Sequence, residues 1–143
     1  MNWTIKTFDQ LTSKEIYEIL RSRAEVFVKE QKISYVDPDG VDYKSWHVFA
    51  TENDKVCAYL RAFKDGDDTI KIGRVLTLVH GKGTGSQLMK YAISELKTKT
   101  NCKKFIMDAQ SHAISFYKRL GFIITSEEYL EEGIPHVDME LTL

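Results

Sequence analysis

The sequence predicts an α/β (α+β) fold, in which helices cover both faces of a mixed, mostly antiparallel twisted sheet of about seven strands. Two observations carry this prediction. Three strand-like runs in the first half are separated only by short turns, which is typical of antiparallel neighbours. Amphipathic helices separate other strand-like runs, and such crossovers join strands of one sheet while the helices cover its faces.

Length and composition suit a single domain over residues 1–143. A second domain would leave neither half of a chain of 143 residues with a comfortable core. Apolar residues make up 43% of the chain, and 7 Phe, 7 Tyr and 2 Trp add the bulk that fills a core. The composition therefore excludes a disordered chain.

The first third of the chain predicts one strand, one helix and a long loop. Apolar and polar residues alternate over 3–8, which suits a strand. Thr12 opens a capping-box pattern, and apolar residues at helical spacing then predict a helix over 13–28. Residues 29–45 have few apolar side chains and contain the turn sequence Asp37-Pro38-Asp39-Gly40. We expect a loop or broken helix here, long enough to be functional.

The remaining elements follow from turn residues and hydrophobic periodicity. The expected strands are 46–51, 56–63, 70–79, 105–107, 122–126 and 137–141. The expected helices run from the glycine cluster to about residue 98 and over 113–120, where Gly121 acts as the C-terminal cap.

Charge and motif spacing exclude several classes of protein. The net charge of −1 draws the whole chain neither to nucleic acid nor to an anionic membrane. No apolar run approaches the length of a membrane span and the N-terminus lacks a signal-peptide pattern, so we expect a cytoplasmic protein. The cysteines and histidines show no metal-ligand spacing, and the aspartate-rich turn lacks the glycine position of a calcium loop. We expect no metal, and two free thiols at Cys57 and Cys102.

A glycine-rich loop, His80-Gly81-Lys82-Gly83-Thr84-Gly85-Ser86, stands between an expected strand and a long helix. Backbone N–H groups at a helix start can bind an anion, so phosphate is the predicted guest. A tight turn without a ligand is the alternative. The glycine spacing matches neither a Walker A loop nor a Rossmann fingerprint, which argues against an ATPase, a nucleotide-binding switch or a dehydrogenase.

A second motif follows in residues 109–122, from Ala109-Gln110 through Phe116-Tyr117 to Gly121-Phe122. Together the two segments resemble the GNAT acyltransferases. The phosphate loop of that family reads Arg/Gln-x-x-Gly-x-Gly/Ala, and its next signature reads Asn-x-x-Ala-x-x-hydrophobic-Tyr-x-x-x-Gly-Phe. His80 and Gln110 depart from the usual residues at the first positions of these motifs.

Further segments resemble the ElaA-like branch, so the resemblance covers nearly the whole chain. They are residues 23–31, His47, Gly73-Arg74-Val75, Ala109-Gln110 and Gly133-Ile134-Pro135-His136. The resemblance implies that the fourth and fifth strands splay apart around Leu76 and Met107, with acetyl-CoA in the gap. The implied acetyl-CoA-binding residues are Leu76, Thr77, Lys82, Gly83, Thr84, Gly85, Ser86, Gln110 and Tyr117.

The family resemblance also implies catalytic roles. A backbone N–H near Leu76 or Thr77 would stabilise the oxyanion, and Tyr117 would protonate the leaving thiolate. Tyr117 could instead be a core aromatic beside Phe116. Glu30 is the candidate general base, acting directly or through water, with an ordinary solvated carboxylate at the end of a helix as the alternative.

The candidate acceptor-binding residues are His47, Arg61, Arg74 and His136. Arg61 and Arg74 fall in runs expected to be central strands, where a charge needs a partner. A structural ion pair with Glu30 or an aspartate is therefore the alternative for both arginines, and His136 could simply begin a strand.

The preferred function is an acetyl-CoA-dependent N-acetyltransferase that acts on a small-molecule primary amine or lysine-like acceptor, as a monomer or homodimer. The alternative is a non-catalytic acyl-CoA-binding or regulatory module that keeps the phosphate loop but has no working base.

Overall fold

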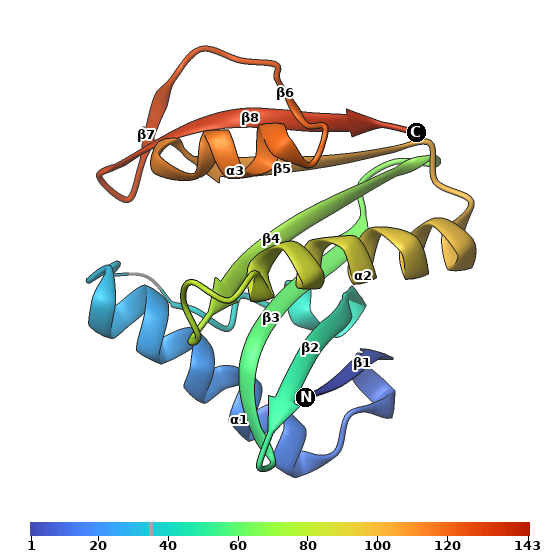
Figure 1. Ribbon diagram of the computed structural model, residues 1–143, viewed down its shortest axis with the longest axis vertical. Coiled ribbons are helices and arrows are strands. Elements are labelled where there is room, and N and C mark those ends of the chain that lie inside the picture. The colour runs from blue at the N-terminus through green and yellow to red at the C-terminus, as the bar shows by residue number, and fades with distance from the viewer. Residues whose placement is uncertain (35) are drawn as a thin grey trace.

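The structure, a computed structural model, describes residues 1–34 and 36–143. Its strands are β1 (Asn2–Thr7), β2 (Trp46–Glu52), β3 (Lys55–Lys64), β4 (Thr69–Thr77), β5 (Lys104–Gln110), β6 (Ile123–Ile124), β7 (Tyr129–Glu131) and β8 (Ile134–Thr142). Its α-helices are α1 (Ser13–Arg23), α2 (Thr84–Thr100) and α3 (Ile114–Arg119). The strands form one mixed sheet in the order β1-β2-β3-β4-β5-β8-β6, and β7 pairs with β8 (Figure 1).

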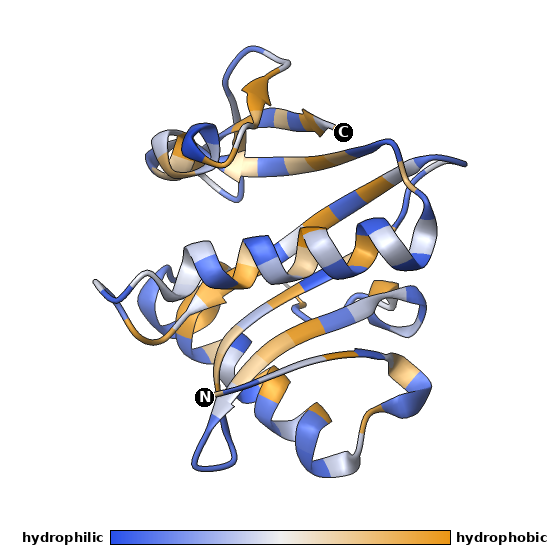
Figure 2. Cartoon of the chain, turned by 45° about the vertical axis from the view of Figure 1, so that its right-hand side comes forward, coloured by the Kyte–Doolittle hydropathy of each residue, from blue (hydrophilic) through white to orange (hydrophobic). Residues whose placement is uncertain are grey.

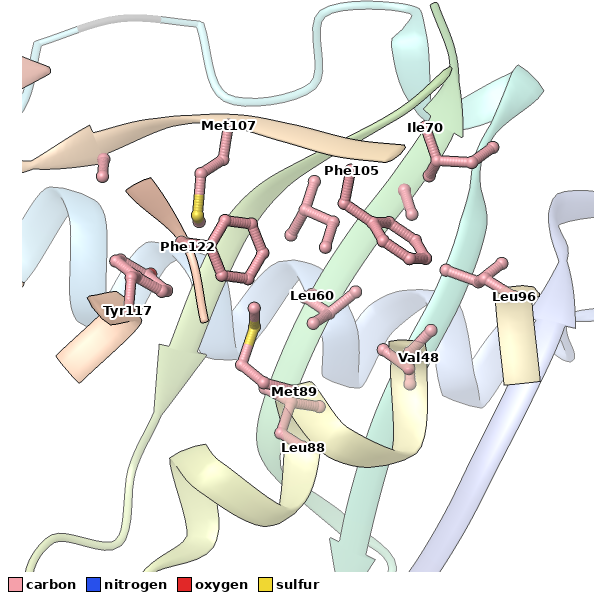
Figure 3. Close-up of a cluster of buried hydrophobic side chains, with 14 of the residues drawn as sticks. Val48, Leu60, Ile70, Leu88, Met89, Leu96, Phe105, Met107, Tyr117 and Phe122 are labelled. Atoms are coloured by element: carbon pink, nitrogen blue, oxygen red, sulfur yellow. The ribbon is translucent and has the colours of Figure 1, made fainter. Parts of the chain in front are cut away.

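Helices cover both faces of this sheet, as predicted. On one face, Leu88, Met89 and Leu96 of α2 pack against Val48 and Leu60, and α3 adds Tyr117 to the same layer (Figure 3). On the other face, Ile19 of α1 belongs to a second cluster with Phe49, Tyr59 and Leu76. β3 and β4 contain hydrophobic stretches, while the hairpin turn between β2 and β3 is hydrophilic (Figure 2). The sheet is therefore buried from both sides in its centre.

Two local elements differ from the expectation. The helix predicted over 13–28 is α-helical only to Arg23 and continues as a π-helix over Ala24–Glu30. The sheet also has one strand more than the seven expected, because β7 forms a hairpin with β8. Glu132 and Gly133 both have positive φ, at 51° and 73°, which is the backbone of a two-residue turn that matches strand twist.

The predicted splay between the fourth and fifth strands is confirmed. Parallel pairing of β4 with β5 covers only Thr69–Ile72 against Lys104–Met107. Beyond that point β4 continues to Thr77 and β5 to Gln110 as separate strands, and the two diverge visibly in Figure 1. Arg74 has a left-handed backbone (φ 53°), next to an irregularity in the β3–β4 register. A bulge of this kind interrupts the ladder locally and bends the strand, and β4 pairs with β3 again at Leu76 and Thr77.

Within the described residues, no helix is long and apolar enough to cross a membrane. The same part of the chain holds no group of three or more His, Cys, Asp or Glu side chains suited to a metal ion. Cys57 and Cys102 are both free and buried.

A buried polar contact joins β2 to β3. His47 Nδ1 lies 2.7 Å from the Tyr59 hydroxyl and Nε2 lies 2.9 Å from the Asp42 carbonyl oxygen. Because a carbonyl only accepts, Nε2–H donates to Asp42 and Nδ1 accepts from Tyr59. Burial lowers the pKa of His47 below its ordinary value, so the neutral ring is the stable form.

We expect stability to depend on pH through His47. As the pH falls below about 6.5, the unfolded chain binds a proton that folded His47 resists, so the free energy of unfolding falls until the pH reaches the lower folded pKa. Denaturant titrations across this range should show a shallower pH slope for His47→Gln than for the wild type. The exposed His80 supplies the control His80→Gln, which should keep the wild-type slope. Equal slopes for His47→Gln and the wild type would contradict this role.

Candidate functional site

The glycine loop forms one side of a groove of about 600 Å³ at the start of α2. Gly81 and Gly83 have φ of 75° and 71°, a left-handed backbone that favours glycine. The first backbone N–H groups of α2 have no partner within the helix, so they and the positive end of the helix dipole can bind an anion at this end. The groove is lined by Val75, Leu76, Thr77, Val79, His80, Gly81, Gly83, Thr84, Gly85, Ser86, Lys90, Phe116, Arg119 and Leu120.

Gly85 brings α2 close to α3. A Cβ built at this position would lie 3.3 Å from the Phe116 ring, so a side chain would force the ring to move. The two sequence motifs therefore meet in space at this contact. Lys90 and Arg119 place a cation from each of these helices on the groove.

A second cavity, of about 550 Å³, lies where β4 and β5 diverge. Its walls come from the π-helix, the loop after it, β3, β4, β5, the start of α3 and the β7–β8 turn. The lining residues are Phe27, Gln31, Ile33, Val36, Asp39, Val41, Arg61, Phe63, Lys71, Ile72, Gly73, Arg74, Val75, Met107, Asp108, Gln110, His112, Ala113, Tyr117, Glu131, Glu132 and His136. Its volume is typical of a small-molecule site.

The groove and the cavity meet at the splay. Val75 of β4 lines both, and the neighbouring α3 residues Phe116 and Tyr117 line the groove and the cavity respectively. Tyr117 is 7% exposed and packs edge-on against Phe122 (Figure 3). Burial raises the pKa of Tyr117 above its usual value, so the phenol carries its proton at neutral pH.

Gln110 lies in the cavity rather than in the groove. Its Nε2 donates to Gln31 Oε1 at 2.9 Å, and its Oε1 accepts from Gln31 Nε2 at 3.3 Å and from His112 Nε2 at 2.6 Å. Gln31 follows the π-helix and Gln110 ends β5. The reciprocal amide pair therefore bridges the two sides of the cavity.

His136 also lines the cavity, opposite Gln110 in the β5–β8 register. Its Nδ1 donates to the Ile134 carbonyl oxygen at 2.7 Å, and its Nε2 lies 3.4 Å from Glu131 Oε2. The ring stacks on Tyr129, whose hydroxyl donates to Asp138 Oδ1 at 2.7 Å. These contacts orient the imidazole in the wall of the cavity.

The structure separates the other candidates. Arg61 and Arg74 line the cavity, and each forms ion pairs with two aspartates, which is the structural alternative considered for them. Glu30 is exposed, and neither it nor His47 belongs to the cavity lining. Lys82 is exposed and is not among the groove-lining residues, although Leu76, Thr77 and residues 83–86 are.

Sequence reasoning missed several lining residues. Lys90, Arg119 and Asp108 lie on regular helices or strands, where periodicity marks them only as surface positions. Gln31 appeared only within the family-like segment 23–31, and no pattern singled it out as a cavity residue, because the π-helix before it was expected to be α-helix followed by loop. One signal was available for Asp39: three aspartates within six residues of a polar loop, with arginines in apolar strands elsewhere.

Comparisons with known proteins agree with this geometry. The family model of the acetyltransferase (GNAT) domain matches residues 22–143. A UPF0039 protein of Schizosaccharomyces pombe is 37% identical, over 100% of this chain and 98% of that protein. Protein ElaA of Escherichia coli is 34% identical, over 97% and 95% of the two chains.

Solved structures show the same fold. The crystal structure of Escherichia coli ElaA has a TM-score of 0.93 and 32% identity, and covers 99% of both chains. An acyl-CoA N-acyltransferase from Pseudomonas aeruginosa has a TM-score of 0.93 and 36% identity, over 99% of this chain and 100% of that one. The chain therefore belongs to the GNAT acetyltransferase family and has ElaA among its relatives.

Proposed function

We propose that this protein transfers the acetyl group of acetyl-CoA to a primary amine by direct attack of the amine on the thioester. The meeting of the groove and the cavity at Val75 carries the proposal, because a donor in one and an acceptor in the other would reach each other there. The similarity to an acyl-CoA N-acyltransferase supports the choice of donor.

The residues of the groove fit a coenzyme A thioester. The backbone N–H groups of residues 83–86 suit its pyrophosphate, and Lys90 and Arg119 suit its remaining phosphate charge. Beyond the loop, the β5-facing edge of residues 73–77 has no paired strand in the described part of the chain. This edge offers backbone groups to the amide-containing arm of the donor, and an N–H at Leu76 or Thr77 to the oxyanion.

The attacking amine must first lose a proton. An alkyl ammonium with a pKa near ~10.4 costs about 4 to 5 kcal/mol to deprotonate at pH 7. We assign the base role to His136, because it lines the cavity and the hydrogen bond from Nδ1–H to the Ile134 carbonyl leaves the lone pair of the neutral ring on Nε2, which takes the amine proton. The Glu131 carboxylate, 3.4 Å from Nε2, can pair with the imidazolium that results. Glu30 is exposed and does not line the cavity, so it could take the amine proton only from outside the cavity.

Tyr117 completes the proton balance. The new N–C bond forms as the C–S bond breaks, the amine proton passes to the base, and the Tyr117 hydroxyl gives its proton to the departing thiolate. The raised pKa of Tyr117 keeps that proton available at neutral pH, and its place in the cavity lining puts it beside the gap between β4 and β5.

The groove can be tested by binding alone. Gly83→Val should weaken acetyl-CoA binding by about ten-fold, or 1.4 kcal/mol, because a side chain blocks close approach of the loop. Gly133→Val is a matched control: both glycines have nearly equal positive φ and open space around them, but Gly133 lies in the β7–β8 turn. Calorimetry should show wild-type affinity for the control. Equal loss in both variants would make the loop an ordinary turn.

The two candidate bases make opposite predictions. His136→Gln should lower kcat by about 10²-fold, most strongly near neutral pH, where an imidazole can be neutral while the free amine is still an ammonium. Glu30→Gln should leave the pH–rate profile unchanged, because its side chain lies outside the cavity lining. Steady-state kinetics from pH 6 to 9 measure kcat for both variants and for the wild type. A fall confined to Glu30→Gln would return the base role to Glu30.

Tyr117→Phe separates an enzyme from a binding module. The wild type should release thiol from acetyl-CoA with at least one of butylamine, putrescine and Nα-acetyl-lysine. The variant removes one oxygen and keeps the ring packed, so kcat should fall by about 10²-fold, the low end for a general acid, while acetyl-CoA affinity and melting temperature barely move. Parallel losses of stability and activity would identify Tyr117 as a core residue only. Binding of acetyl-CoA without turnover of any amine would favour the acyl-CoA-binding module.

A further inference from the structure

Three arginines and three aspartates alternate in a closed ring of ion pairs beside the cavity. We call this set the ion-pair ring; in order around it, the members are Arg23, Asp37, Arg74, Asp39, Arg61 and Asp42. Each aspartate joins two arginines, and each arginine joins two aspartates. The ring as a whole is electrically neutral.

One half of the ring centres on Asp37. Its Oδ2 accepts from Arg23 Nε at 2.9 Å and its Oδ1 from Arg74 Nε at 3.0 Å. The carbonyl oxygen of the same residue accepts from Nη2 of both arginines, at 3.0 and 3.1 Å. Asp37 therefore ties the end of α1 to β4.

The other half joins β3 to the same loop. Arg61 donates to both carboxylate oxygens of Asp39 at 2.8 Å, and its Nη1 also donates to Asp42 Oδ1 at 3.1 Å. Arg23 Nη1 reaches the same Asp42 oxygen at 2.7 Å. A longer contact, 3.5 Å from Arg74 Nη2 to Asp39 Oδ2, closes the ring.

Burial makes these pairs mutually dependent. The side chains of Arg23 and Arg61 are only 1% and 6% exposed. A buried charge is tolerated when it is paired, and removing one partner leaves the other uncompensated. Neighbouring guanidinium groups lower the pKa of Asp39. They also lower the pKa of Asp42, although the burial of this carboxylate acts in the opposite direction. Both carboxylates therefore remain ionised across the neutral range.

The ring holds one wall of the cavity. All three aspartates belong to the loop between the π-helix and β2, whose residues Val36, Asp39 and Val41 line the cavity. The arginines come from α1, β3 and β4, which are anchored in the sheet and its helical layer. The ring is therefore the connection between a polar loop and the rigid part of the fold.

The ring also reaches the splay. Arg74 has a left-handed backbone (φ 53°) and lies two residues after Ile72, the last position of β4 that pairs with β5. A residue other than glycine in this conformation is strained, and such strain persists where surrounding contacts hold it. The contacts of Arg74 with Asp37 and Asp39 are contacts of this kind.

We propose that the ion-pair ring is the positioning network of the acceptor cavity: it fixes the loop wall and the bulge of β4 relative to each other, so that Arg61 and Arg74 act as positioning residues and do not bind the acceptor. The proposal rests on acetyl transfer in this cavity. Both terminal nitrogens of Arg61 donate to aspartates. Its Nε is buried, and among the described residues it is the one buried side-chain nitrogen or oxygen without a hydrogen-bond partner.

Arg74→Asn tests the network with little disturbance of the backbone, because asparagine tolerates positive φ better than most residues. We expect faster hydrogen exchange of residues 36–45 and a kcat/KM for the best amine of the panel (butylamine, putrescine, Nα-acetyl-lysine) lowered about 10- to 100-fold through misplacement of the wall. The Kd for acetyl-CoA should change by less than about two-fold. Arg74→Lys, which restores the charge but not the two-pronged geometry, should recover part of both losses.

Arg21→Gln is the matched control, because Arg21 also pairs with two carboxylates, Glu18 and Glu25, but on the more exposed side of α1. Arg21→Gln should change neither the hydrogen exchange of residues 36–45 nor the kcat/KM for the amine. A kinetic loss in Arg74→Asn without faster loop exchange would mean direct contact with the acceptor, and faster exchange without a kinetic loss would limit the ring to holding the loop; either result overturns the proposal. Absence of turnover in the wild type itself would count against acetyl transfer.

Discussion

β4 and β5 pair over four positions and then part, and both the groove and the cavity depend on this separation. A continuous parallel ladder would have satisfied the backbone along the whole of β4 and left no room between the strands. The backbone groups of residues 73–77 instead face an opening. Burial on both faces of the sheet keeps the strands in place on either side of it. The opening is therefore a stable feature of the fold and needs no movement to form.

Different forces hold the two sides of the opening. On the side of α2 and α3, apolar packing is enough, because Leu88, Met89, Tyr117 and Phe122 share one buried cluster. On the side of the loop after the π-helix, few apolar side chains are available. Charged groups hold this segment, and arginine suits the task because its planar fork can pair with two carboxylates at once.

Buried charge carries a large desolvation cost, and the arrangement around Arg23 offsets it with several contacts. The guanidinium lies 5.7 Å from the centre of the Tyr59 ring and pairs with two aspartates. Tyr59 in turn donates to His47, whose other nitrogen donates to the Asp42 carbonyl oxygen. These contacts link α1, β2, β3 and the loop in one polar network. Apolar residues of similar size could match its stability, so stability alone does not account for a charged network at this place.

The sequence by itself determined the class of fold, the glycine loop and the family, since each depends on a local pattern: periodicity, turn residues or motif spacing. The splay followed from the sequence only as what the family resemblance implies. Capping at Thr12 and Glu15 and the C-terminal cap at Gly121 appear where those patterns predict them. Tertiary structure alone decided the partners of Arg61 and Arg74, the exposure of Glu30 and the meeting of Gln31 with Gln110. These contacts join residues as many as 79 positions apart. No local pattern specifies such pairs, because the packing of whole helices and strands sets which distant side chains meet.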